Sequence, residues 1–93
     1  MQYSPKPMQT DDIILSKELT AVIEEISMNI HEVWAVGRMN QGWQYGEKYS
    51  TDQKMHPSLV PYTELPESEK EFDRNTVTQT IKCLLKKGFE IKE

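Results

Sequence analysis

Between residues 17 and 39, apolar side chains recur every three or four positions, and this pattern constrains the fold more than any other feature of the chain. One face of an α-helix has this period, because the helix makes a turn every few residues. The apolar positions are Leu19, Val22, Ile23, Ile26, Ile30, Val33, Trp34 and Gly37. Ser16 precedes the pattern as a candidate N-cap, and a polar stretch ending in Gly42 follows it. We therefore predict a long amphipathic helix over residues 17–39.

The length and charge of the chain exclude several classes of protein. Its 93 residues suffice for one small domain, and a formal net charge of −4 is the wrong sign for a general nucleic-acid binder or for a protein of anionic membrane surfaces. No apolar run is long enough to cross a membrane, so we expect neither a membrane protein nor a channel. Cys83 is the only cysteine, which excludes an internal disulfide and favours the reducing cytoplasm.

The rest of the chain divides into an arm, a long connection and a second helical region. Residues 1–10 contain Pro5 and Pro7 and are predicted to be a flexible arm, so that residues 11–93 form a single domain. Residues 43–62 show no period and are interrupted by glycine and proline. This pattern predicts a long loop, which its aromatic side chains hold against the helices.

The second helical region begins near Pro66, a residue suited to a first helical turn. Phe72 does not share the helical face of the later apolar residues, which are Val77, Ile81, Leu84 and Leu85. Thr76 and Gln79 have the spacing of a capping box, which favours a break near Asn75. Two interpretations stay open: a helix that breaks at this point, or a short turn that precedes a longer helix.

Four stretches, in this order and at consistent spacing, carry a family resemblance. The first, residues 29–46, reads N-I-H-E-V-W-A-V-G-R-M-N-Q-G-W-Q-Y-G. The others are residues 52–60 (D-Q-K-M-H-P-S-L-V), 62–70 (Y-T-E-L-P-E-S-E-K) and 80–88 (T-I-K-C-L-L-K-K-G). Together they resemble the ryanodine-receptor-type repeat, or RyR domain, which occurs in tandem in ryanodine receptors and as single copies in bacterial proteins.

The resemblance implies a mainly α fold with two principal helices, a long ordered connecting loop and a small two-stranded β element that joins the chain ends. The expected strands are the β-branched run at residues 13–15 and the alternating residues 89–91, which follow Gly88 at the expected helix end. In ryanodine receptors the repeats are peripheral regulatory modules, associated with adenine-nucleotide-like ligands held by aromatic side chains between two repeats. By this resemblance, a chain with one repeat completes such a pocket only as a homodimer.

Candidate ligand-binding residues gather on the first helix and in the loop after it. His31, Trp34 and Arg38 share one flank of the helix, because residues three and four apart lie on the same face. A tryptophan can stack on a flat heterocycle, and an arginine one turn away can bind a phosphate or carboxylate. The loop supplies further candidates, namely Trp43, Tyr45, Lys48, Asp52, Lys54 and His56. We expect the basic ones to add positive charge and Asp52 to accept a hydrogen bond from a base or sugar hydroxyl.

The same residues also have purely structural interpretations. Trp34 is then an aromatic side chain at the edge of the core, and His56 hydrogen-bonds within the loop. Trp43 and Tyr45 hold the loop against the helices. His31 is not part of a metal motif, because no second histidine follows at helical spacing, and we expect neither a metal nor a cofactor.

The sequence favours two non-catalytic functions, and an enzyme is a third possibility only if a deep pocket brings His56 against a carboxylate or Cys83. Cys83 has no histidine near it, and neither a nucleophile-elbow motif nor a glycine-rich phosphate loop occurs. The first function is a regulatory module that binds a small, nucleotide-like, anionic ligand. The alternative is a protein-interaction or self-assembly module, such as a homodimer, without a small ligand. In that case the aromatic surface of Trp34, Trp43 and Tyr45 forms the interface.

Overall fold

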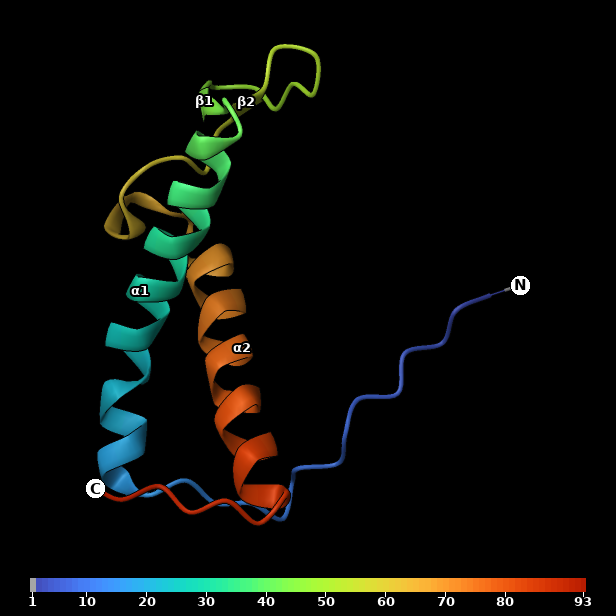
Figure 1. Ribbon diagram of the computed structural model, residues 1–93, viewed down its shortest axis with the longest axis vertical. Coiled ribbons are helices and arrows are strands. Elements are labelled where there is room, and N and C mark those ends of the chain that lie inside the picture. The colour runs from blue at the N-terminus through green and yellow to red at the C-terminus, as the bar shows by residue number, and fades with distance from the viewer. Residues whose placement is uncertain (1) are drawn as a thin grey trace.

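Two long helices lie side by side and run in opposite directions in the computed structural model, which describes residues 2–93 (Figure 1). The elements follow the order α1 (Lys17–Asn40), β1 (Gln44–Tyr45), β2 (Met55–His56), the 3-10 helix η1 (Tyr62–Glu64) and α2 (Glu67–Lys86). The fold is mainly helical with a minor β element, as predicted. The connection between the helices lies over one end of the helix pair, and the segments that enter α1 and leave α2 lie at the other end.

Helix α1 confirms the prediction from the apolar period, and its two ends have the expected caps. The Ser16 hydroxyl accepts a hydrogen bond from the Leu19 backbone N–H at 3.1 Å. At the other end, Gly42 has a φ of +91°, which places it in the left-handed region. The Gly42 and Trp43 N–H groups donate to the carbonyl oxygens of Met39 and Arg38 at 3.0 and 3.1 Å. This Schellman arrangement ends the helix and turns the chain back over its last turn.

Helix α2 is continuous, so the predicted break near Asn75 is wrong. The Thr76 hydroxyl does not cap a new helix but donates to the Phe72 carbonyl oxygen one turn earlier, at 3.0 Å. A continuous helix also keeps Arg74 in line with Glu67 and Glu71, to which its guanidinium is hydrogen-bonded. The interactions within one uninterrupted helix therefore prevail over the local capping signal.

The two-stranded β element is present, but it lies elsewhere than predicted. Strands β1 and β2 belong to the loop between the helices and pair in parallel, with Gln44 opposite Met55 and Tyr45 opposite His56. The segments 13–15 and 89–91 at the chain ends are not strands. Side chains join the chain ends instead, since Lys86 pairs with Asp12 at 2.9 Å and the Ser16 hydroxyl donates to the Glu93 carboxylate at 2.9 Å.

The buried apolar core comes mostly from the connecting segment and from α2. Its members are Trp43, Leu59, Tyr62, Leu65, Val77 and Ile81. Helix α1 adds two buried polar side chains, His31 and the fully buried Ser27. Much of the predicted apolar stripe of α1 is therefore only partly covered, with Val33 64% exposed and Ile26 37% exposed.

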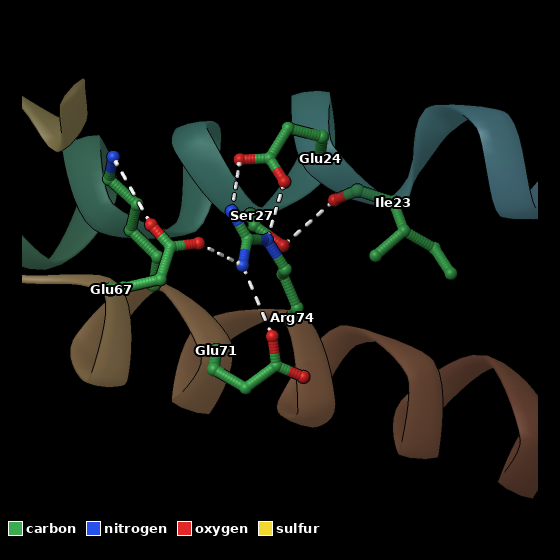
Figure 2. A network of polar contacts seen from close by, with 7 residues as sticks. Ile23, Glu24, Ser27, Glu67, Glu71 and Arg74 are labelled. Atoms are coloured by element: carbon green, nitrogen blue, oxygen red, sulfur yellow. Dashed lines mark hydrogen bonds and ion pairs between the residues drawn. The ribbon is translucent and has the colours of Figure 1, made fainter.

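A network of charged side chains joins the two helices (Figure 2). Arg74 of α2 reaches Glu24 of α1 through two nitrogens, at 2.5 and 3.2 Å, and donates to Glu67 and Glu71 of its own helix at 2.8 and 3.1 Å. The hydrogen bonds from Arg74 hold the pKa of the Glu24 carboxyl below its ordinary value. Near this network, the Ser27 hydroxyl donates to the Ile23 carbonyl oxygen at 2.8 Å.

The N-terminal residues 2–9 are exposed and form no helix or strand, and they extend away from the helices (Figure 1). Among the described residues Thr10 is the first that is buried, at 3% exposed, and its hydroxyl donates to the Gln79 side chain at 2.9 Å. This contact anchors the chain to α2 at the predicted boundary between arm and domain. Met1, part of the predicted arm, lies outside the described residues.

Candidate functional site

A cavity of about 500 Å³ opens between α1, the connecting segment and α2, and we call it the inter-helix cavity. This volume lies within the range of small-molecule sites. Its walls combine aromatic and apolar side chains with hydroxyl, imidazole and carboxylate groups. The lining residues are Ile30, His31, Trp34, His56, Ser58, Leu65, Ser68, Glu69, Phe72, Asp73 and Thr76.

Helix α2 supplies one wall through a single face. Phe72 and Asp73 each lie three or four residues from both Glu69 and Thr76, so the helical turn places the four side chains on one face. The Phe72 ring is 74% exposed, an unusual position for a large apolar side chain. The cavity is therefore open to solvent on this side.

Helix α1 supplies the opposite wall through His31 and Trp34. Their rings are stacked, with centroids 5.4 Å apart and an angle of 24° between the planes. His31 is 5% exposed, and its Nε2 atom lies 2.7 Å from the Val60 carbonyl oxygen. Because a carbonyl oxygen only accepts, this nitrogen carries the proton and donates. The bond holds the connecting segment against α1 beside the indole.

His56, at the end of β2, also lines the cavity. Its Nδ1 atom accepts a hydrogen bond from the Ser58 backbone N–H at 3.0 Å, so the proton of the neutral ring is on Nε2. Burial lowers the pKa of His56, and the charge of Arg38 lowers it further, against an opposing effect of Glu69. Its ring meets the Trp34 ring edge-on, with centroids 4.9 Å apart. His56 therefore adds a neutral N–H donor to the cavity.

Two carboxylates give the cavity its charge. The Glu69 carboxylate accepts a hydrogen bond from the Ser58 hydroxyl at 2.5 Å. Burial raises the pKa of the half-buried Asp73 carboxyl, and Glu69 raises it further, although His31 has the opposite effect. Among the described residues, no lysine or arginine lines the cavity.

The structure brings only part of the predicted site together. His31, Trp34 and His56 line the inter-helix cavity. Arg38 lies over the Trp43 ring, 4.7 Å from its centroid, and 5.9 Å from the centroid of Trp34. Its guanidinium is thus stacked within the protein rather than in the cavity wall. Trp43 is 9% exposed and packs beneath it.

The remaining predicted residues do not line the cavity. Tyr45, Lys48, Asp52 and Lys54 are all exposed on the part of the loop around the small sheet. Lys54 has a φ of +55°, and its ammonium donates to the Gln41 carbonyl oxygen at 2.9 Å, so it holds the loop onto the end of α1. Neither Lys48 nor Lys54 therefore brings its positive charge to the cavity wall.

Sequence reasoning missed the wall that α2 provides. It placed none of Glu69, Phe72, Asp73 and Thr76 in a binding site. The available signal was the spacing of these residues, which puts an aromatic ring and two carboxylates on one helical face. That signal becomes specific only once the packing of α2 against α1 is known.

The cavity lies inside a segment that matches a known family. The family model of the RyR domain matches residues 3–93. The chain belongs to the RyR domain family. This match includes both helices of the RyR domain, the connecting segment and every residue that lines the cavity. It confirms the resemblance carried by the four sequence stretches.

Within residues 2–93, neither the length nor the hydropathy of any helix suits a membrane span. Over the same residues, no three His, Cys, Asp or Glu side chains are placed together as ligands for a metal ion. Cys83 is a free, half-buried thiol on α2.

Proposed function

We propose that this RyR domain is a non-catalytic binding module that holds a small, flat ligand in the inter-helix cavity. The observation that carries the proposal is an open cavity of about 500 Å³ with aromatic and polar walls contributed by both helices. Sites for small molecules have this composition, with apolar walls that bury the ligand and a few polar groups that orient it. The lone cysteine favours a cytoplasmic setting for the module.

The walls suit a ligand with a planar ring. Trp34 and Phe72 come from different helices and offer ring surface to a flat molecule. The His56 N–H group, the Thr76 hydroxyl and the Glu69 carboxylate can orient it through hydrogen bonds. These groups complement a heterocycle that carries both donors and acceptors, such as the base of a nucleotide-like ligand.

The phosphate part of a nucleotide-like ligand has weaker support. Arg38 is stacked over Trp43, and Lys54 is bonded to the Gln41 carbonyl oxygen. To bind a phosphate in the cavity, Arg38 would have to leave this stack. The proposal therefore rests on the flat part of the ligand.

The proposal is tested by thermal unfolding with a ligand panel of adenine, adenosine and adenosine monophosphate. A ligand that binds only the native state raises the melting temperature as its concentration rises. Phe72→Ala, an exposed position, should abolish the shift without unfolding the protein. Phe89→Ala, at an equally aromatic position that is 64% exposed but outside the cavity, should leave the shift intact. Equal shifts in both variants would place binding elsewhere.

One observation favours the alternative of a protein-interaction or self-assembly module. A flank of α1 carries apolar side chains that the fold leaves partly exposed, including Val22 (38%), Ile26 (37%), Val33 (64%) and Val36 (58%). Exposed apolar patches mark interaction sites. Light scattering over a concentration series tests this alternative. A dimer that Val33→Ser weakens, formed without any small ligand, would favour assembly over ligand binding.

A further inference from the structure

The inter-helix cavity contains two carboxylates, and no lysine or arginine of the described residues lines it. Glu69 and Asp73 are one turn apart on α2, so both carboxylates face the same space. Glu69 accepts one hydrogen bond, from Ser58. Neither carboxylate belongs to an ion pair among residues 2–93.

The basic side chains on neighbouring turns are engaged elsewhere. Arg74 is bound within the network that joins α1 and α2 (Figure 2). Lys70 lies 5.8 Å from the centroid of the Tyr62 ring and 3.8 Å from a Glu67 oxygen. Arg38 lies over Trp43. Among the described residues, the only basic groups of the cavity wall are therefore the imidazoles of His31 and His56, and no lysine or arginine lines it.

The environment of Asp73 makes this imbalance unfavourable. The carboxylate is half-buried, and burial raises its pKa; the charge of His31 opposes this effect, and the charge of Glu69 adds to it. A partly desolvated carboxylate without a cation is costly to the fold. A bound cation would remove this cost, which gives binding a driving force.

The aromatic side chains beside the carboxylates suit the same kind of ligand. Trp34 and Phe72 line the cavity with Glu69 and Asp73, and the Phe72 ring is 74% exposed. Cations are attracted to the faces of aromatic rings, most strongly to tryptophan. A flat cation can use both features, because its plane contacts a ring while its N–H groups point to carboxylates.

We propose that the inter-helix cavity binds a small organic cation with a planar amidinium or guanidinium head. The head lies between Glu69 and Asp73, where its paired N–H groups match carboxylate oxygens. The hydrocarbon or aromatic part of the ligand packs against Trp34 and Phe72. This assignment rests on the proposed function of the cavity and adds the sign of the ligand's charge.

Three small molecules of nearly equal shape test the preferred charge of the ligand directly. Benzamidine is a cation, benzamide is neutral and benzoate is an anion, so isothermal titration calorimetry with this series separates charge from fit. We expect benzamidine to bind about tenfold more tightly than benzamide, the effect of one charge-assisted hydrogen bond. We expect no measurable binding of benzoate.

Variants then locate the interaction. Asp73→Asn and Glu69→Gln each keep the shape of the side chain and should weaken benzamidine binding about tenfold, with little effect on benzamide. Glu90→Gln is the matched control, because it makes the same change in net charge at an exposed position outside the cavity. Equal weakening in Glu90→Gln would show a general charge effect and overturn the assignment.

The outcomes separate this inference from the proposed function. One outcome would contradict only the inference: benzoate or adenosine monophosphate binds, benzamidine does not bind, and Phe72→Ala removes the binding. The cavity would then be a ligand site with the opposite charge preference. If no member of either series binds the wild-type protein, the inference and the proposed function both fail.

Discussion

The Nε2 atom of His31 lies 2.7 Å from the carbonyl oxygen of Val60, a hydrogen bond between the middle of α1 and the connecting segment. The imidazole is 5% exposed and stacks on the Trp34 indole. One buried side chain therefore satisfies a loop carbonyl group and positions an aromatic wall of the inter-helix cavity. The stability of the domain and the shape of the cavity are linked at this residue.

Replacing His31 tests this link. His31→Ala removes the donor to the Val60 carbonyl group and leaves space in the interior, and we expect a loss of about 1–3 kcal/mol in the free energy of unfolding. His31→Gln retains a donor of similar reach and should restore part of the loss. Urea denaturation measures both. If the two variants are equally destabilised, the hydrogen bond contributes nothing beyond packing.

Glycine substitutions separate backbone conformation from packing. Gly42 and Gly88 end α1 and α2 with φ values of +91° and +95°, so alanine at either position should destabilise the fold by about 1 kcal/mol. Gly37 lies inside α1, with nothing within 4 Å of an added Cβ atom. Gly37→Ala should therefore stabilise the protein by about 0.5–1 kcal/mol. Thermal unfolding compares the three, and a loss in Gly37→Ala would contradict the account of α1.

Ser27 tests how closely α1 packs against its surroundings. The side chain is fully buried, and its hydroxyl bonds to the Ile23 carbonyl oxygen of the same helix. Ser27→Ala keeps the small volume, and we expect a change within about 1 kcal/mol. Ser27→Leu adds volume that the interior has no room for and should cost about 1–3 kcal/mol. Chemical denaturation of both variants checks the prediction. If Ser27→Leu leaves the free energy of unfolding unchanged, the helices can separate at this point.

The raised pKa of Asp73 predicts how the stability of the fold depends on pH. Burial raises the pKa of this carboxyl above 3.8, so the folded protein binds a proton more readily than the unfolded chain does. The ionised carboxylate therefore destabilises the fold, and this penalty fades as the pH falls through the raised pKa. Asp73→Asn should raise the melting temperature at neutral pH, and the gain should shrink on acidification.

Asp12 provides a control, because its effect on the pH dependence of stability has the opposite sign. Its hydrogen bond with Lys86 holds the pKa of the carboxyl below 3.8, so ionised Asp12 stabilises the fold until the pH falls through that lowered value. Asp12→Asn should slightly lower the melting temperature at neutral pH, and the difference from wild type should vanish in acid. Melting curves over a pH series give both profiles. Parallel profiles for the two variants would refute the assigned environments.

Features set by neighbouring residues could be predicted from the sequence. The apolar period, Ser16 and Gly42 together define α1, because a helix and its caps depend on residues within a few positions. The resemblance also predicted the second helix and the long ordered connection. The break near Asn75 was a local signal too, but contacts from Arg74 to α1 and along α2 outweigh it.

Features set by long-range packing could not be predicted. The β1–β2 pair places Gln44 opposite Met55, and the residues between them show no periodic pattern that would predict the pairing. The stack of Arg38 on Trp43 arises because the end of α1 folds the chain back onto its last turn. Asp73 looked like one more charged residue on a helix, since only the packing of α2 beside α1 brings it into a cavity with Trp34.

The central claim is that the inter-helix cavity binds a small flat ligand, and a ¹H–¹⁵N NMR titration tests it most directly. The chain has two tryptophans, of which Trp34 lines the cavity and Trp43 is packed under Arg38. With benzamidine or adenosine, we expect the Trp34 indole N–H signal to shift, together with the amides of residues 68–76, while the Trp43 signal moves little. Spectra that stay unchanged at millimolar ligand, or shifts confined to the exposed flank of α1, would contradict the claim.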